Sequence, residues 1–215
     1  LGDVYKRQVQ NIASCDEVWV VSRGAGENLR SLGYEGDYIV MENGVDVPRG
    51  RVSDEAIAAA TGRYDLPQNV PVFLFVGRLM WYKGIRIILD ALKTLREKNV
   101  DFRMVFVGEG ADGAEIRSYA EERKLSDRCF FTGAISDREI IRAWYGRSDL
   151  FLFPSTFDTN GLVVREAAAS GTATVMIRNS CASEGVGDRR NGFCIEENAA
   201  AMAAKLAVSY THLRA

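Results

Sequence analysis

From residue 71 onward, short apolar runs alternate with longer amphipathic stretches, and this alternation most constrains the fold that the chain can adopt. The apolar runs have the length of buried strands and occupy residues 72–76, 102–107, 129–132, 149–153, 172–177 and 193–195. The stretches between them have the length and spacing of helices and occupy residues 84–98, 112–124, 137–147, 161–170 and 197–207. Strands that alternate with helices of this length form βαβ units, so the sequence predicts an α/β fold with a doubly wound parallel sheet.

The part of the chain before residue 71 is organised differently. Its predicted elements are strands at 17–22 and 38–41, helices at 25–32 and 54–64, a turn at Asn43 and Gly44, and a linker at 46–51. Ser53 or Asp54 is expected to cap the second of these helices. The first and last eight residues show no clean period. We expect residues 1–8 and 208–215 to be foreign to the native protein, the alternative being ordinary frayed termini.

Composition excludes several classes of function. Lys and Arg number 27 against 29 Asp and Glu, a net charge of −2, which argues against a general nucleic-acid binder. With one histidine, His212, a multi-histidine metal site or a Ser-His-Asp or Cys-His pair is close to excluded, and we predict no metal site.

The four cysteines lie far apart with no Cys-x-x-Cys spacing, as is typical of reduced thiols in a cytoplasmic protein. No apolar run approaches the ~18 residues of a membrane span. Most tryptophans and phenylalanines are expected in the core.

In a doubly wound sheet, ligands bind outside the carboxyl ends of the strands, so the loops that follow the strands are the candidate sites. The loop at residues 77–84 begins at Gly77 and carries Arg78 and Lys83 beside the start of a predicted helix. Two cations next to the free amides of a helix end can hold a phosphate. The alternative is a pair of solvated surface cations.

The loop at residues 108–113 reads GEGADG and matches G-x-G-x-x-G, which taken alone proposes dinucleotide binding. The dinucleotide pattern requires an acidic residue near the end of the next strand, where this chain has Thr132 and Gly133. The loop also follows the second strand of the repeat, not the first. A tight turn, whose glycines allow two backbone segments to approach closely, is the better interpretation.

The loop and helix at residues 154–171 carry two carboxylates, Asp158 and Glu166, eight positions apart. Asn160 and Gly161 open the helix, so the amides near its start have no partner within it. The carboxylates can accept hydrogen bonds from vicinal hydroxyls while the amides hold an anion. The alternative is a capped helix whose carboxylates only favour its positive end.

These motifs, taken in order, resemble glycosyltransferase family 4, the group 1 retaining enzymes of GT-B fold. The segments that carry the resemblance are WVVS, IVMENGVDV, VFLFVGRLMWYKG, VFVGEG, FFTGAIS, SDLFLFPSTFDTNGLVVREAAASGTATV and NGF. The resemblance covers roughly residues 12–207 and implies a Rossmann-like domain that is the C-terminal half of a GT-B fold. By this resemblance, residues 1–48 are the end of an N-terminal acceptor domain with its linker, residues 49–207 bind the donor, and residues 208–215 are a non-native tail. Most of the acceptor domain and the family's closing C-terminal helix would then be absent.

The same resemblance implies roles for individual residues. Arg78 and Lys83 would contact the diphosphate of the donor, Glu166 its ribose, and the backbone near Ala134 and Ile135 its base. The amides of Gly161, Leu162 and Val163 would contact phosphate and sugar. The remaining expected donor-binding residues are Gly77, Gly108, Glu109 and Asn160. Asp158 would contact the transferred sugar at a position where the family usually has Glu. Because Asp is one methylene shorter, the identity of the sugar does not follow from the resemblance.

The implied reaction moves a sugar from a UDP-, GDP- or ADP-sugar to an acceptor with retention of configuration and without a cofactor. We expect Arg78, Lys83, Asp158 and Glu166 to carry it, and we expect this chain alone to be inactive. The acceptor stays open between a lipid, a saccharide and a polysaccharide precursor, with peripheral membrane contact in the lipid case. The alternative is a nucleotide-binding module without transferase activity, either of NAD type or similar to a sugar-nucleotide epimerase.

Overall fold

The structure is a computed structural model, and it describes residues 2–46 and 51–213. Residues 51–213, the C-terminal lobe, are built on a six-stranded sheet in which every strand runs parallel to its neighbours. The strands, in their order across the sheet, are β5 (Cys129–Gly133), β4 (Arg103–Val107), β3 (Val72–Val76), β6 (Leu150–Phe153), β7 (Ala173–Ile177) and β8 (Phe193–Ile195). The predicted doubly wound parallel sheet is confirmed, and each strand lies within its predicted range or extends it by one residue.

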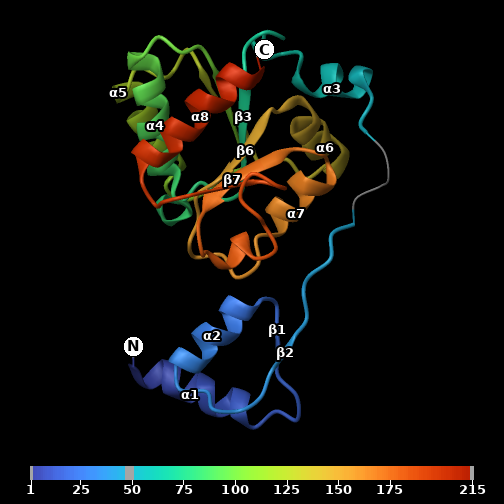
Figure 1. Cartoon of the computed structure of the whole chain (residues 1–215), viewed down its shortest axis with the longest axis vertical. Helices are drawn as coiled ribbons and strands as arrows, with labels where there is room; N and C mark the ends of the chain where they lie inside the picture. The colour runs from blue at the N-terminus through green and yellow to red at the C-terminus, as the bar shows by residue number, and fades with distance from the viewer. Residues whose placement is uncertain (1, 47–50, 214–215) are drawn as a thin grey trace.

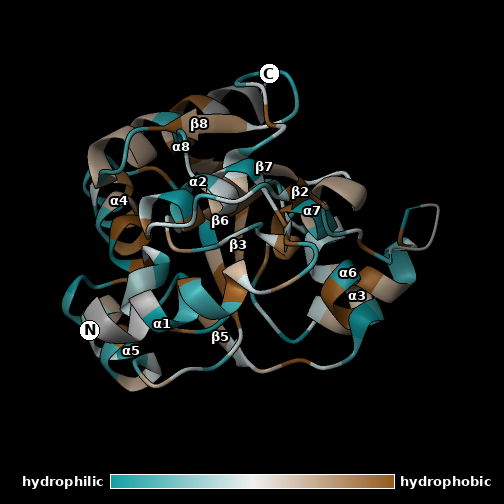
Figure 2. Cartoon of the chain, turned by 90° about the horizontal axis from the view of Figure 1, so that it is seen from below, coloured by the Kyte–Doolittle hydropathy of each residue, from teal (hydrophilic) through white to brown (hydrophobic). Residues whose placement is uncertain are grey.

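Helices cover both faces of this sheet (Figure 1). One face is covered by α4 (Ile85–Glu97), α5 (Gly113–Glu122) and α8 (Ala199–Leu213), and the other by α6 (Arg138–Arg147) and α7 (Leu162–Ala169). Helix α3 (Asp54–Thr61) packs on α6, and its cap is Ser53, whose Oγ accepts a hydrogen bond from the Ala56 amide at 3.2 Å. Figure 2 shows both hydrophobic and hydrophilic residues along α4 and α6, as expected of helices with one face on a sheet.

The hydrophobic core lies on the two sides of the central strands. All five residues of β3 are buried, and they divide between two apolar clusters, one under α4 and the other under α6 and α7. This is why the strands read as continuous apolar runs. Trp144 is buried as expected of an aromatic core residue, whereas Trp19 and Phe157 are 59% and 74% exposed.

Residues 2–46, the N-terminal lobe, contain a small parallel pair of strands and two helices. The elements are α1 (Gly2–Ala13), β1 (Trp19–Val20), α2 (Arg23–Ser31) and β2 (Ile39–Val40). The sequence did not predict α1, and both strands are shorter than predicted. Helices α1 and α8 include parts of the two terminal octets. The predicted domain boundary between residues 48 and 49 lies outside the described residues.

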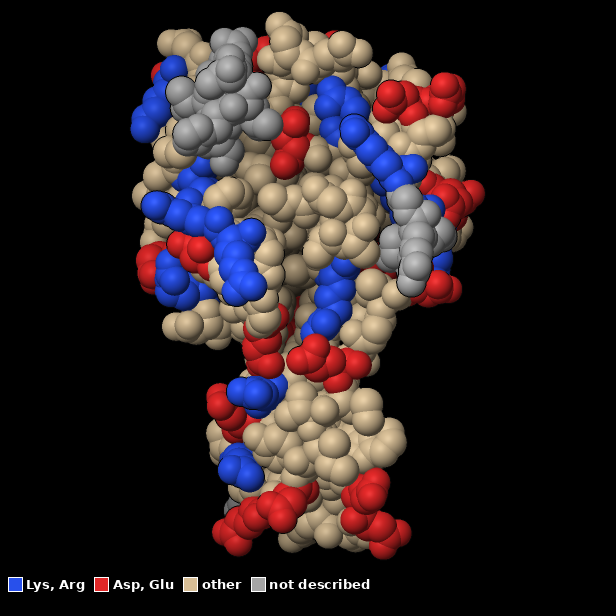
Figure 3. Space-filling view, turned by 45° about the vertical axis from the view of Figure 1, so that its right-hand side comes forward, with Lys and Arg blue, Asp and Glu red and all other residues tan. Residues whose placement is uncertain are grey.

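The two lobes meet at a narrow junction flanked by acidic and basic side chains (Figure 3). Ser22, at the start of α2, and Thr159, in the loop after β6, lie in contact there. Within the described parts of the chain, no helix combines the length and the apolar character needed to cross a membrane.

Candidate functional site

A cavity of about 270 Å³, here called the first cavity, lies at the carboxyl ends of β3 and β6. The chain leaves these two strands in opposite directions along the sheet, β3 toward β4 and β6 toward β7. Such a switch point opens a crevice between the loops, where ligands of doubly wound folds bind. The cavity is lined by Asn43, Phe75, Val76, Gly77, Lys83, Phe153, Asp158, Thr159, Asn160, Gly161, Leu162 and Val163.

Two charged side chains meet in the first cavity. Lys83 ends the short 3-10 helix η1 (Trp81–Lys83), and its Nζ lies 2.6 Å from Oδ1 of Asp158. The two side chains are 12% and 21% exposed, so water screens this pair less than it would a surface pair. The other carboxylate oxygen, Oδ2 of Asp158, is buried without a hydrogen-bond partner. The cavity therefore holds a cation paired with a carboxylate that can still accept a hydrogen bond.

The start of α7 borders the same cavity. Gly161 precedes the helix with φ of +63°, and a Cβ there would lie 2.8 Å from the Cβ of Ala182. The Val164 amide donates to the Gly161 carbonyl at 2.8 Å, as in a normal first turn. The amides before it have no carbonyl within the helix to bond to, and they carry the positive end of the helix dipole. This end of α7 can hold an anion.

A second cavity, of about 260 Å³, adjoins the first, because Leu162 lines both. Glu166 lines it together with the buried Tyr145. The Tyr145 hydroxyl donates to the Val163 carbonyl at 3.1 Å and lies 3.4 Å from Oε2 of Glu166. Burial, together with the neighbouring charge of Glu166, raises the pKa of Tyr145 far above its ordinary value. Tyr145 therefore stays a protonated donor that orients Glu166.

The structure brings together only part of the predicted site. Gly77, Lys83, Asp158 and the residues from Asn160 to Val163 line the first cavity, and Glu166 lines the second. The other predicted residues lie outside the lining of both cavities, and they are Arg78, Gly108, Glu109, Ala134 and Ile135. Arg78 is exposed, with its guanidinium 6.0 Å from the ring centre of Tyr82. The roles predicted for all of these residues stay predictions.

The N-terminal lobe supplies lining residues that sequence reasoning missed. Asn43 lines the first cavity, and Gly44, Val45 and Asp46 line the second. The dipeptide of Asn43 and Gly44 signalled only a turn, and its place at the cavities depends on how the lobes meet. The side chain of Asn160 reaches the same junction, because its Nδ2 donates to the Val21 carbonyl.

The glycine-rich loop after β4 packs against the loop after β3. The Gly108 amide donates to the Gly133 carbonyl at 2.9 Å, and a Cβ on Gly108 would overlap the Gly77 carbonyl. A Cβ on Gly110 would overlap the backbone of Leu79. The glycines thus allow two loops to touch, which confirms the prediction of close backbone approach.

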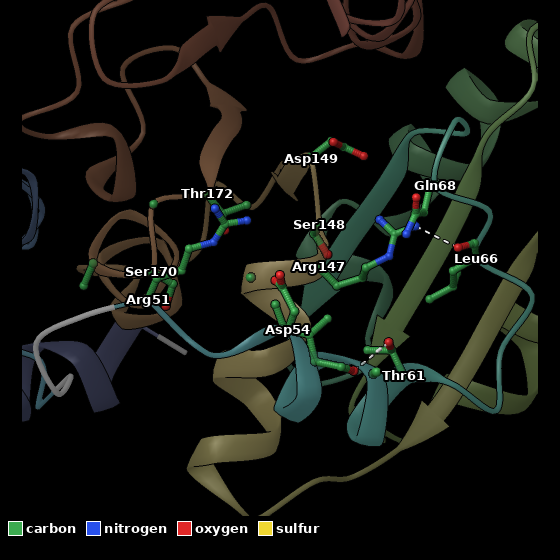
Figure 4. A pocket seen from close by; sticks show the side chains of 15 residues that line it. Arg51, Asp54, Thr61, Leu66, Gln68, Arg147, Ser148, Asp149, Ser170 and Thr172 are labelled. Atoms are coloured by element: carbon green, nitrogen blue, oxygen red, sulfur yellow. Dashed lines mark hydrogen bonds between the residues drawn. The ribbon is translucent and has the colours of Figure 1, made fainter. Parts of the chain in front are cut away.

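A larger cavity, of about 980 Å³, lies at the opposite ends of the strands, where β6 and β7 begin (Figure 4). Two of the charged side chains that line it, Arg147 and Asp149, have structural partners. Arg147 donates to the carbonyls of Leu66 and Pro67, and Asp149 accepts from the Val72 amide at 2.8 Å. We place the functional site at the smaller cavities, because they combine a cation, carboxylates and free helix amides.

Comparison with known proteins shows the family and the fold of the chain. The model of the family described as "Glycosyl transferases group 1" matches residues 58–210. The chain is 33% identical over 134 residues to a 2-deoxystreptamine glucosyltransferase of Streptomyces kanamyceticus, covering 62% of the chain and 34% of that protein. It is 28% identical over 199 residues to a D-inositol 3-phosphate glycosyltransferase of Streptomyces avermitilis, covering 88% of the chain and 43% of that protein.

Among solved structures, Anabaena Alr3699/HepE in complex with UDP-glucose superimposes with a TM-score of 0.86. The match has 21% sequence identity and covers 99% of the chain and 59% of the other. At this identity the likeness is one of fold. The chain spans less than half the length of the two curated relatives named above.

Proposed function

Since the chain belongs to the glycosyl transferases group 1, we propose that it binds a nucleoside-diphosphate sugar and serves to transfer that sugar to an acceptor. The donor would lie across the two adjoining cavities at the carboxyl ends of β3 and β6. One observation carries this proposal: Lys83, the start of α7 and the unpartnered Oδ2 of Asp158 all line the first cavity. A cation and free amides suit phosphate, while a carboxylate oxygen suits a sugar hydroxyl.

The diphosphate is assigned to the space between Lys83 and the start of α7. Because Lys83 already neutralises Asp158, a phosphate can enter without facing an unpaired carboxylate. Arg78 lies in the same loop, its exposed guanidinium beside Tyr82, and a rotation of this long side chain brings it to the phosphates. Oδ2 of Asp158 would then accept a hydrogen bond from the sugar.

The nucleoside is assigned to the second cavity. Glu166 would accept hydrogen bonds from the ribose hydroxyls, held in position by the buried hydroxyl of Tyr145. Ala134 and Ile135, at the end of β5, would contact the base through their backbone. This assignment leaves the base open between uracil, guanine and adenine.

Breaking the glycosidic bond moves negative charge onto the departing diphosphate. Lys83 and the α7 amides lie where that charge would grow, and Arg78 would join them after its side chain rotates, so together they would stabilise the transition state more than the ground state. We further propose retention of configuration, as in the family that the motifs of the chain resemble. The UDP-glucose bound in the Anabaena structure supports a nucleotide-sugar donor. The acceptor would contact the N-terminal domain.

Binding can be tested on the chain by calorimetry with UDP, GDP and ADP. We expect one of them to bind, and we expect Lys83→Ala and Arg78→Ala each to weaken that binding by about ten- to a hundredfold, because each removes a charged contact to phosphate. The matched control is Lys93→Ala, which removes an exposed lysine of α4 and should leave the affinity unchanged.

Two results would contradict the proposal. Either the chain binds none of the three nucleotides, or both cavity variants keep the wild-type affinity. NAD is included as a fourth titrant, because binding of NAD in place of the diphosphates would favour a dinucleotide module.

A further inference from the structure

Two hydrogen bonds join the N-terminal lobe to the loop that forms the first cavity. The Ser22 hydroxyl donates to the Thr159 carbonyl at 2.5 Å, and the Asn160 amide group donates to the Val21 carbonyl. Ser22 and Asn160 are 2% and 6% exposed, so water does not compete at this contact. Thr159 and Asn160 lie between Asp158 and Gly161, which both line the first cavity.

A third contact lies next to these two. Glu184, in the loop after η2 (Cys181–Ser183), places its carboxylate on the start of α2. Its Oε2 accepts from the Arg23 amide at 2.9 Å, and its Oε1 accepts from the Gly24 amide at 2.6 Å. The next amide of the helix, that of Ala25, donates to the Ser22 hydroxyl at 3.0 Å. The C-terminal lobe thus caps a helix of the N-terminal lobe with a negative charge at its positive end.

A fourth contact is weaker by comparison. Nη2 of Arg165 lies 3.1 Å from Oε2 of Glu42, but the two side chains are 33% and 62% exposed. Exposed ion pairs contribute little to stability, whereas hydrogen bonds from backbone amides to a carboxylate are among the stronger hydrogen bonds in proteins. Of the two carboxylate contacts between the lobes, that of Glu184 is therefore the stronger.

We propose that Glu184 is a positioning residue for the first cavity. By holding the start of α2, it keeps Val21 and Ser22 against the loop that carries Asp158, and so fixes Asp158 and the first amides of α7 relative to Lys83. Glu184 does not line either cavity. That the positioned groups bind a nucleotide sugar rests on the proposed function, but the positioning itself does not.

The test compares Glu184→Gln with Ser22→Ala. The second variant is needed because Ala182 packs against Gly161, so a change at position 184 can also reach the loop through its own lobe. Ser22→Ala removes the hydroxyl that donates to the Thr159 carbonyl, and so reaches the loop from the N-terminal lobe without a change at position 184. The charge-matched control is Glu121→Gln, at an exposed position on α5.

The first readout is the NMR order parameters of the backbone amides of residues 159–163, measured without ligand. We expect them to fall in both variants and to stay unchanged in the control. The second readout is the affinity for whichever of UDP, GDP and ADP the wild type binds, which we expect to weaken about five- to thirtyfold in both variants. A third readout is hydrogen exchange of the Arg23 and Gly24 amides, which the nucleotide should slow in the wild type because coupling is reciprocal.

Unchanged order parameters in Glu184→Gln, whether or not they fall in Ser22→Ala, would overturn the positioning role of Glu184. If the wild type binds none of the nucleotides, the proposed function fails, and the order parameters still decide the positioning. A change in Glu184→Gln without one in Ser22→Ala would also overturn the proposal, because the effect would then pass through Ala182 alone.

Discussion

Tyr145, on α6, contacts α7 beside Glu166, the residue that is predicted to bind the ribose. Its ring is buried under α7, while its hydroxyl bonds to Val163 and reaches Glu166. The sequence placed Tyr145 in a helix and assigned it no role, because nothing local shows that its hydroxyl meets a carboxylate on the next helix. A buried hydroxyl with a defined partner both stabilises the fold and orients that partner.

Replacing this hydroxyl should change how stability depends on pH. In Tyr145→Phe we expect a loss of about 1 kcal/mol in the free energy of unfolding near neutral pH, from the lost hydrogen bond. The pKa of Tyr145 is raised in the folded state, while the unfolded value is about 10. Above pH ~10 the unfolded chain therefore loses this proton first, and the wild type loses stability that the variant does not lose.

Urea unfolding of both proteins at neutral pH and near pH ~11 checks this expectation. The difference in stability should shrink as the pH rises, and the other tyrosines cancel because both proteins contain them. A difference that stays constant or grows would contradict it.

At the scale of elements, Gly84 sets how η1 and α4 approach the end of β6. Its φ is +75°, and a Cβ there would overlap the Pro154 carbonyl oxygen. This close approach puts Lys83, at the end of η1, beside Asp158. Gly171 offers a comparison, because its φ is +80° but nothing lies within 4 Å of a Cβ built on it.

The two glycines should therefore respond differently to alanine. We expect Gly171→Ala to lower the free energy of unfolding by about 1–2 kcal/mol, from backbone strain alone. Gly84→Ala should lower it by roughly 2–5 kcal/mol, because overlap with Pro154 adds to the strain. Chemical unfolding of the two variants measures both values, and equal losses would show that the approach to Pro154 relaxes without cost.

Particular elements show what the sequence could predict. The β3 run, VFLFV, predicts its strand without error, because a strand covered on both faces is apolar throughout. Lys83, Asp158 and the start of α7 line the same cavity, because loops after neighbouring parallel strands lie at the same ends of the strands, and the roles predicted for them stay predictions. The turn at Gly84 and the place of Asn43 escaped prediction, because each depends on contacts between distant segments. Helix α1 escaped prediction although Tyr5, Val9 and Ile12 recur at helical spacing.

At the scale of the molecule, the two lobes differ in what holds them together. Both hydrophobic clusters around the six-stranded sheet consist of residues from the C-terminal lobe. The N-terminal lobe joins it mainly through hydrogen bonds and an ion pair at the junction. The C-terminal lobe should therefore keep its stability without the N-terminal one.

Removal of residues 1–46 tests this expectation. We expect the midpoint of thermal unfolding of the C-terminal lobe to change by no more than a few degrees, since no buried apolar area of its core is lost. As a comparison, Leu206→Ala in the full chain should lower the free energy of unfolding by about 2–5 kcal/mol, because Leu206 is fully buried under α4. A truncated chain that unfolds at room temperature would contradict the expectation.

The polar character of the junction between Glu184, Ser22 and Asn160 has a consequence for motion. When the lobes separate, water can replace the hydrogen bonds that the amides and carbonyls lose. Because the junction is polar, the separation also exposes little apolar surface. An interface of this kind can open and re-form each time a ligand enters or leaves. An interface of packed leucines would keep the two lobes together.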